Sequence, residues 1–247
     1  MTEKKIAIIS DIHGNSIALN AVLKDIKTKG IERIINLGDS LYGPLDPKGT
    51  FDLLETNKVI SISGNQDRII LENLGNKSDS ITLEYVKSQL DDKIVEWLKK
   101  LTFNKVIEKD IFCFHASPHS DSEYLLEKIN DGFISTKEIN EIEEILTDIK
   151  QKIVVCGHSH ISRIVKSDKK LIVNPGSVGL PAYDDDLPVY HKMQNFNPLA
   201  SYAVMNIHEN SVSVERLSID YDSEASARLA EENKRDDWAK WIRTGIV

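Results

Sequence analysis

The sequence predicts an α/β protein in which mixed β-sheets are stacked inside layers of helices. In the N-terminal part, short apolar strands alternate with amphipathic helices, which is typical of parallel β-α-β units. Later segments alternate apolar and polar residues and contain turn signals, which indicates antiparallel hairpins. The chain has 247 residues, which suits one large domain or two small ones.

The first unit consists of a strand, a helix and a second strand. Lys5–Ser10 is a short apolar run of the buried-strand type. Apolar residues then recur at helical spacing, with Asn15 or Ser16 as the helix cap and Gly30 at the helix end. The second strand is Arg33–Leu37. A strand, helix and strand in this order predict a right-handed crossover and a parallel pair.

The remaining elements follow from the same periodicities. We predict helices over residues 47–57, 81–101, 139–149 and 222–244, strands over 59–63 and 152–156, and hairpins over 105–114, 163–174 and 202–217. The last helix is expected to pack Trp238, Trp241 and Ile242 against the rest of the protein.

Composition and charge limit the classes of function. The chain is 40% hydrophobic and 28% charged, as in ordinary globular proteins, and its net charge of −8 argues against nucleic acid or anionic membranes as partners. Cys113 and Cys156 lie in apolar runs, so we expect two free, buried thiols. The N-terminal apolar run is too short for a signal peptide, and no stretch approaches the ~20 apolar residues of a membrane span. We therefore expect a cytoplasmic protein.

Five predicted strands are each followed by residues whose side chains can bind a metal. These residues are Asp11 and His13, then Asp39, then Asn65, then His115, and finally His158 and His160. In open α/β sheets, ligands bind in the crevice at the carboxyl ends of the strands. We therefore expect the seven side chains to converge.

Each of these signals also has an ordinary structural explanation. Asp-x-His after a strand can form an Asx-turn, and Gly-Asp or Gly-Asn pairs are common in turns. A single histidine at a strand end is more often a hydrogen-bonded neutral imidazole than a ligand. Gly157-His158-Ser159-His160 is a stronger signal, because two histidines two residues apart on an extended segment point the same way.

The donor types predict which metals bind. Imidazole and carboxylate donors without thiolate favour Mn, Fe, Zn, Co or Ni over Ca or Mg. Seven ligands are too many for one ion, whereas two ions ~3.5–4 Å apart and bridged by a carboxylate would use them all. Two divalent ions carry more charge than Asp11 and Asp39 neutralise. The remaining positive charge suits a phosphorylated substrate.

These residues resemble the calcineurin-like metallophosphoesterase superfamily. The similar blocks are Asp11-Ile-His13-Gly-Asn15, Gly38-Asp39, Gly64-Asn65-Gln66-Asp67, His115 and Gly157-His158-Ser-His160, in the order found in the family. Residues 174–179 (NPGSVG) extend the resemblance to a branch of small bacterial phosphodiesterases. The resemblance implies a four-layer α/β/β/α sandwich of two mixed β-sheets flanked by helices, formed by residues 1–247 as a single domain.

The resemblance also implies roles for the ligands. Asp11, His13, Asp39 and His160 would hold one metal, and Asn65, His115 and His158 would complete the second, with Asp39 as the bridge. A hydroxide bridging the metals would attack phosphorus in line, which makes Asp39, Asn65 and His158 the candidate catalytic residues. Manganese is the metal that we expect to support activity in vitro. Asn15 would either contact a phosphate oxygen or cap the first helix.

Two features depart from the family pattern. Many relatives have a histidine at the position of Gln66, thought to assist departure of the leaving group, and glutamine is no general acid. This change favours leaving groups that are stable anions, and His119 is a candidate second acid.

The second departure is a longer segment at residues 184–199, a candidate lid or substrate wall. Tyr183, Tyr190 and Phe196 could stack on a base, and His191 or Lys192 could bind a distal phosphate. The alternatives are a plain surface loop or a contact between copies of the chain in a homo-oligomer.

These observations favour an enzyme that hydrolyses small phosphodiesters or dinucleoside polyphosphates. A protein or monoester phosphatase is the alternative, but the segment after Asp39 lacks the arginine found there in protein phosphatases of this superfamily. A non-catalytic metal-binding scaffold, similar to a trafficking-complex subunit with this fold, is the alternative from another class. That subunit has a degraded metal site. In this chain all seven candidate ligands are present, which argues against a scaffold that has lost its activity.

Overall fold

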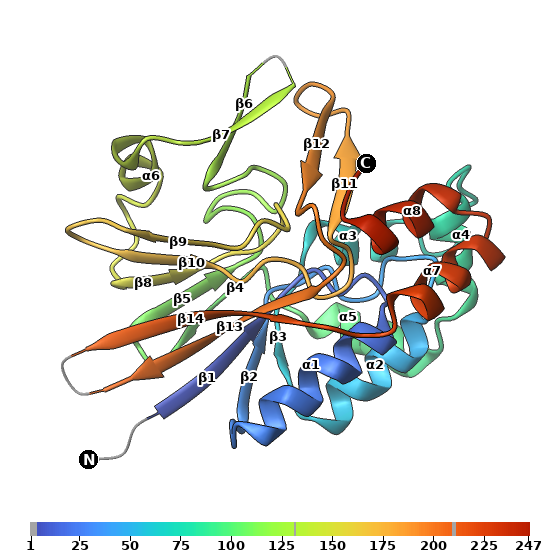
Figure 1. Ribbon diagram of the computed structural model, residues 1–247, viewed down its shortest axis with the longest axis horizontal. Helices are drawn as coiled ribbons and strands as arrows, with labels where there is room; N and C mark the ends of the chain where they lie inside the picture. Colours follow the sequence, from blue (N-terminus) through green and yellow to red (C-terminus); the bar gives the residue numbers. More distant parts are fainter. Residues whose placement is uncertain (1–3, 131, 209–210) are drawn as a thin grey trace.

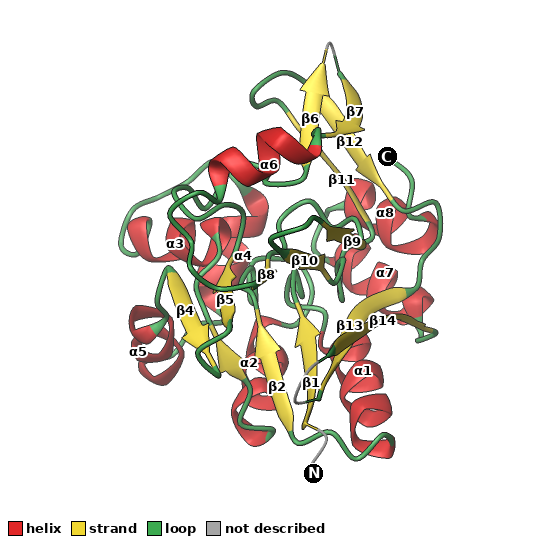
Figure 2. Cartoon of the chain, turned by 90° about the vertical axis from the view of Figure 1, so that its left-hand side faces the viewer, coloured by secondary structure: helices red, strands yellow, loops and turns green. Residues whose placement is uncertain are grey.

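The computed structural model describes residues 4–130, 132–208 and 211–247 (Figures 1 and 2). Its helices are α1 (Ser16–Thr28), α2 (Pro47–Thr56), α3 (Asn65–Glu72), α4 (Ile81–Ser88), α5 (Asp92–Lys100), α6 (Ile139–Ile145), α7 (Ser223–Glu232) and α8 (Asp236–Thr244). Its strands are β1 (Lys4–Ile9), β2 (Arg33–Asn36), β3 (Ile60–Ser61), β4 (Asn104–Ile107), β5 (Ile111–Phe114), β6 (Glu127–Asn130), β7 (Phe133–Thr136), β8 (Ile153–Val155), β9 (Arg163–Lys166), β10 (Leu171–Asn174), β11 (Ala182–Asp185), β12 (His191–Gln194), β13 (Ala200–Ile207) and β14 (Val212–Ile219).

Most strands form two mixed sheets, as predicted, and each of these sheets has five strands. The first sheet has the order β14-β13-β1-β2-β3, with β1, β2 and β3 parallel and β13 antiparallel to β1. The second has the order β4-β5-β8-β10-β9, with β5, β8 and β10 parallel. The hairpins β6–β7 and β11–β12 form separate two-stranded sheets that project together from one end of the molecule (Figures 1 and 2).

The alternation of side chains along β1 explains how the layers pack. Ile6 and Ile8 lie between the two sheets, in a core shared with residues of β5 and β8. Ala7 and Ile9 point to the opposite face, where they pack against α1. The outer face of the second sheet packs against Ile142 of α6. The four-layer α/β/β/α sandwich is therefore confirmed.

Two long predicted helices are wrong, because each is divided in two. In the segment 81–101, Asp91 accepts a hydrogen bond from the Ile94 N–H and so begins α5 as a new helix. In the segment 222–244, Lys234 has a φ of 61° between α7 and α8, which a continuous helix does not allow. The helix predicted over 139–149 ends at Ile145.

Some elements were not predicted. Helix α3 begins at Asn65, directly after the short strand β3, and the hairpin β6–β7 gave no clear signal. Residues 184–199 are not a plain loop, because they contain most of the hairpin β11–β12. The predicted hairpin over 202–217 corresponds to β13 and β14, and residues 209–210 of its turn lie outside the described residues.

Two further expectations can be compared with the structure. Cys113 and Cys156 are free and buried, as predicted. Within the described part of the chain, we find no helix with the length and apolar character needed to cross a membrane.

The core between the sheets gives a first prediction. Ile8 is fully buried there, so Ile8→Ala should lower the free energy of unfolding by about 2–5 kcal/mol. The matched control is Ile164→Ala in β9, because Ile164 is 39% exposed. Urea denaturation measures both variants, and equal losses would contradict a closely packed core around Ile8.

Candidate metal centre

The predicted ligands follow the carboxyl ends of parallel strands, and the structure brings them together in two groups. Asp11, His13 and His160 form one group, and Asp39, His115 and His158 form the other. Within each group the candidate ligand atoms lie within 4.8 Å of one another, and all six side chains are buried. Asn65 joins the second group, since its Oδ1 atom is 3.0 Å from His115 Nε2.

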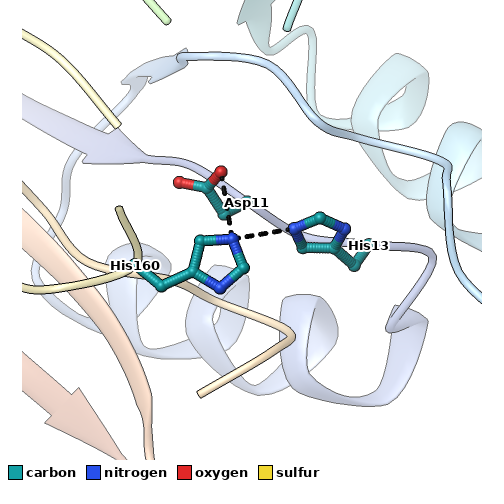
Figure 3. Close-up of side chains that lie close together, drawn as sticks. All are labelled: Asp11, His13 and His160. Atoms are coloured by element: carbon teal, nitrogen blue, oxygen red, sulfur yellow. Dashed lines mark hydrogen bonds and ion pairs between the residues drawn. The ribbon is translucent and has the colours of Figure 1, made fainter. Parts of the chain in front are cut away.

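The first group contains two imidazole nitrogens that face each other (Figure 3). Nδ1 of His13 donates to the Tyr42 carbonyl at 3.0 Å, and Nδ1 of His160 donates to the Leu180 carbonyl at 2.6 Å. In the neutral rings, both Nε2 atoms therefore carry lone pairs, although they lie only 3.0 Å apart. Such lone pairs repel each other unless a cation lies beside them.

The Asp11 carboxylate fits the same cation. Its Oδ1 atom is buried, has no hydrogen-bond partner among the described residues, and lies 3.4 Å from His160 Nε2. Its Oδ2 atom accepts a hydrogen bond from the His158 N–H at 3.1 Å. A buried carboxylate oxygen without a donor is costly, so the donor set and its orientation both fit a metal ion.

The second group is oriented in a similar way. Nδ1 of His115 donates to the Leu37 carbonyl at 2.9 Å, and its Nε2 atom is 3.4 Å from Asp39 Oδ2. His158 donates from Nε2 to the Ser122 carbonyl, which leaves its Nδ1 atom with a lone pair. His115 Nε2 is also 3.9 Å from Asp11 Oδ1, so the two groups adjoin.

The backbone at these positions has an unusual conformation. Positive φ angles between 53° and 67° occur at Asp11, His13, Asp39, His158 and His160. Residues other than glycine adopt this region rarely, and such strain costs on the order of 1–3 kcal/mol per residue. This conformation occurs just after β1, β2 and β8, where the chain turns as it leaves the sheet.

Burial and mutual charge determine the protonation of the histidines. Burial, reinforced by nearby imidazoles, lowers the pKa of His13 and of His158 to about 4. Burial opposes the charged form of His115 too, but the carboxylates of Asp39 and Asp11 outweigh it and raise the pKa of His115 to about 10. The histidines in turn outweigh burial at Asp11 and Asp39 and lower the pKa of both carboxyls.

Asp67 is a site residue whose role was not predicted. Its buried carboxylate accepts hydrogen bonds from the backbone N–H groups of Asp39, Ser40 and Gly64, at 2.9–3.1 Å. Burial and the Asp39 charge raise the pKa of Asp67 to about 7, against these donors. Asp67 thus ties the loop of Asp39 to the start of α3. The sequence signals were its place three residues after Gly64 and its inclusion in the block Gly64-Asn65-Gln66-Asp67, and neither indicated this role.

Asn15 acts as the cap of α1, one of its two predicted roles. Its Oδ1 atom accepts from the Ala18 N–H at 3.1 Å, and its Nδ2 atom donates to the Gly179 carbonyl at 2.9 Å. The side chain is buried, and both of its amide atoms already have partners. A contact between Asn15 and phosphate stays a prediction.

The other predicted substrate residues lie farther out. His119 is exposed and lines a hollow of about 740 Å³, which Asn65 and His158 also line. His191 is buried, and its ring nitrogens bind the Tyr124 hydroxyl and the Val189 carbonyl. Lys192 is exposed and lines a separate hollow that none of the seven candidate ligands lines.

The hairpin β11–β12 supports the ligands through Tyr183. Its hydroxyl donates to the His158 carbonyl at 3.0 Å and lies 2.8 Å from the Tyr124 hydroxyl. The Tyr124 ring stacks on the His158 ring, with 4.7 Å between centroids. The sequence indicated Tyr183 only as part of a substrate wall.

A cavity of about 220 Å³ opens beside the metal ligands. Its walls include His13, Asp39, Asn65, His158 and His160, together with aromatic and charged residues from β11 and α8. It shares Asn65, His158 and Asp185 with the hollow of about 740 Å³. The two hollows therefore adjoin at Asn65 and His158 of the candidate metal centre.

Comparison with known proteins agrees with this geometry. Residues 5–209 match the family model of the calcineurin-like phosphoesterase superfamily domain. The chain belongs to this superfamily. The calcineurin-like phosphoesterases depend on divalent metals, and the two ligand groups agree with this dependence. Membership also supports a phosphoesterase, and so a hydrolase, as the general type of enzyme.

Individual relatives of this calcineurin-like chain cover nearly its full length. An uncharacterized protein of Methanocaldococcus jannaschii is 28% identical over 262 residues, which is 96% of each chain. A metallophosphoesterase from Sphaerobacter thermophilus has a TM-score of 0.75 at 21% identity and covers 98% of this chain and 99% of its own. A hypothetical protein from Pyrococcus horikoshii has a TM-score of 0.76 at 19% identity and covers 98% of both chains. At these identities the two structures show a shared fold.

The lowered pKa values predict how the metal-free protein responds to acid. An unfolded histidine takes up a proton near pH 6.5, whereas His13 and His158 stay neutral in the folded protein down to about pH 4. Each of these histidines should therefore lower the free energy of unfolding by on the order of 3 kcal/mol as the pH drops from 6.5 towards 4. Asp67, whose pKa is raised to about 7, takes up a proton in the folded protein first and offsets part of this loss in all the variants compared. Below pH 6.5, His115 is protonated in both states and adds nothing to this change.

Urea denaturation in EDTA across this pH range measures the effect. His13→Gln should make the loss clearly smaller than in the parent protein, because one buried neutral imidazole is gone. The exposed His119→Gln serves as the control and should leave the loss unchanged. Equal pH dependence in all three proteins would show that His13 is not held neutral by the fold.

Proposed function

We propose that the protein is a hydrolase that cleaves phosphoester or phosphoanhydride bonds of small substrates at a pair of divalent transition-metal ions. The supporting observation is that two adjacent groups of buried ligands lie where two hollows meet. Asp11, His13 and His160 would hold one ion, and Asn65, His115 and His158 the other, with Asp39 between them.

The charges of the site support an anionic substrate. Two divalent ions bring four positive charges, while Asp11 and Asp39 bring two negative ones and the neutral histidines none. When bound, the ions would polarise the phosphoryl oxygens and make water available as a nucleophile near neutral pH. The protein's part is to keep His13 and His158 neutral and to orient each ring through a backbone carbonyl.

The two hollows support a substrate with groups on both sides of the scissile phosphorus. Because Asn65 and His158 line both hollows, a phosphoryl group bound there would direct one substituent into each. A diester or a phosphoanhydride has two such substituents, whereas a simple monoester has one. This geometry ranks phosphodiesters and dinucleoside polyphosphates above monoesters and phosphoproteins.

Gln66 narrows the choice of leaving group. Its backbone N–H donates to Asp39 Oδ1 at 2.9 Å, and its side chain lines the cavity with a buried Oε1 atom. An amide has no proton to give as a general acid. Leaving groups that are already stable anions, such as phosphates and phenolates, should therefore depart most readily.

We also propose a cytoplasmic location for the protein, because its two cysteines are free, as is usual in the reducing cytoplasm.

Removing single ligands tests the metal centre. Asp39→Asn and His158→Ala should each lower manganese-dependent turnover of bis(p-nitrophenyl) phosphate by more than about 100-fold, since ligand loss exceeds the effect of outer residues. The fold should persist, as circular dichroism would show. Asp52→Asn is the control, because Asp52 is an exposed acidic residue that pairs with Lys48 on α2.

Retained activity in either ligand variant would count against the proposed site. A parent protein that binds no metal and stays inactive after loading with Mn, Fe, Zn, Co or Ni would instead favour the scaffold function. Metal content measured by mass spectrometry separates these two outcomes.

A substrate panel tests the ranking of substrates. With manganese, bis(p-nitrophenyl) phosphate and diphosphate diesters should be cleaved with at least about tenfold higher kcat/KM than p-nitrophenyl phosphate, because only they fill both hollows. Release of p-nitrophenol and chromatography of nucleotides measure the rates. A clear preference for the monoester would contradict the proposal and favour a monoester phosphatase.

A further inference from the structure

The smaller cavity carries charges that the proposed reaction does not use. Asp184 and Asp185 of the hairpin β11–β12, and Arg235 and Asp237 at the start of α8, line it beside the metal ligands. Arg235 is the one lysine or arginine among the described residues that line this cavity. These four side chains together contribute a charge of −2 at neutral pH.

Arg235 and Asp237 form an ion pair in the cavity wall. The guanidinium donates from Nε and Nη2 to the two Asp237 oxygens, at 2.8 and 2.7 Å, and from Nη1 to the Thr82 hydroxyl. It also lies over the Trp238 ring, 5.3 Å from the centroid. Side-chain exposures of 22% and 44% keep both partners accessible. Two of the five guanidinium N–H groups are left for a ligand, next to carboxylate lone pairs.

Aromatic side chains form the apolar part of the same wall. Trp238 and Trp241 are only 4% and 7% exposed, yet both line the cavity. Helix α8 is held in place by packing against Leu180 and Ala182, next to β11 (Figure 1). The wall therefore offers an apolar surface framed by fixed hydrogen-bond donors and acceptors.

The charge balance indicates what this cavity can accept. Two divalent ions contribute +4 and Asp11 and Asp39 contribute −2, so the metal centre keeps a surplus of +2 for the phosphoryl group. The four wall residues, in contrast, give the rest of the cavity a charge of −2. A polyphosphate arm would face the two carboxylates of Asp184 and Asp185, which Arg235 does not neutralise because it is paired with Asp237. A cationic group would face Arg235, which already covers a face of Trp238. An uncharged group that both donates and accepts hydrogen bonds meets neither penalty.

Size limits the group further. The cavity volume of about 220 Å³ is below the ~300–1,000 Å³ typical of pockets for drug-sized ligands. The adjoining hollow of about 740 Å³ is left for the larger part of the substrate.

We infer that this cavity binds an uncharged, hydroxyl-rich substituent of the substrate, such as a single sugar ring or glycerol. Asp237 and Arg235 hydrogen-bond its hydroxyl groups, and Trp238 and Trp241 pack against its carbon skeleton. The inference rests on the proposed function and specifies its substrate class. Hydrolysis of a nucleoside diphosphate sugar would then break the phosphoanhydride bond with one water and give a nucleoside monophosphate and a sugar 1-phosphate.

Kinetics with three substrates test this inference. For UDP-glucose, Asp237→Asn should lower kcat/KM at least about tenfold, mainly through KM, because a hydrogen bond to a charged group is lost. For bis(p-nitrophenyl) phosphate the same change should matter less than about twofold, since no hydroxyl is present. For diadenosine tetraphosphate it should raise kcat/KM, because Arg235 loses the carboxylate that neutralises it. Asp236→Asn is the matched control, since Asp236 lies in the same helical turn and does not line the cavity.

Equal losses with all three substrates would show that Asp237 only stabilises α8, and they would overturn the inference. Faster cleavage of UDP-glucose by Asp237→Asn would overturn it as well.

Saturation-transfer NMR of UDP-glucose with the metal-free protein gives a readout independent of turnover. The glucose protons should receive saturation in the parent protein and lose it in Asp237→Asn. If no substrate is cleaved, the proposed function fails, and the NMR experiment alone then tests the sugar subsite. Absence of saturation on glucose in the parent protein would overturn the sugar subsite.

Discussion

The carboxyl ends of the two sheets meet so closely that a methyl group would not fit between them. A Cβ atom on Gly157, after β8, would lie 2.0 Å from Ser10 Oγ and 2.9 Å from Asp11 Oδ2. On Gly38, after β2, it would lie 2.3 Å from the Gly64 nitrogen. Glycine at these positions lets the ends of four strands approach within ligand distance. The convergence of imidazole and carboxylate groups depends on this close contact.

This closeness has an electrostatic cost for the metal-free protein. Two carboxylates and four imidazoles are buried together, and Asp11 Oδ1 is left without a hydrogen-bond donor among the described residues. His115 offsets part of this cost by holding a proton beside Asp39, which its raised pKa reflects. Divalent ions would replace that proton and lie next to the facing nitrogens of His13 and His160 as well. Metal binding and stability of the fold are therefore coupled.

The sequence was sufficient to predict the strands of the two large sheets and the groups that converge at their carboxyl ends, because both signals are local. An apolar run followed directly by Asp11 or His115 indicates where a strand ends and which metal-binding side chain follows it. The helix breaks at Asp91 and Lys234 were missed, because the apolar periodicity continues across them. Asp67 was noticed only as part of the block Gly64-Asn65-Gln66-Asp67. Its hydrogen-bond partner lies in a loop 28 residues earlier in the chain, so this local pattern could not reveal its role.

Local sequence patterns did not predict which residues line the smaller cavity either, because its wall forms through tertiary packing. Arg235, Asp237 and Trp238 become part of the site only because α8 packs beside β11, more than 70 residues after the last ligand, His160. They also lie outside residues 5–209, the part that matches the superfamily. The matched part supplies the metal ligands, whereas α8 supplies side chains that a substrate would meet. Membership of the superfamily therefore says little about the substrate, because specificity comes from segments attached to the fold rather than from the fold itself.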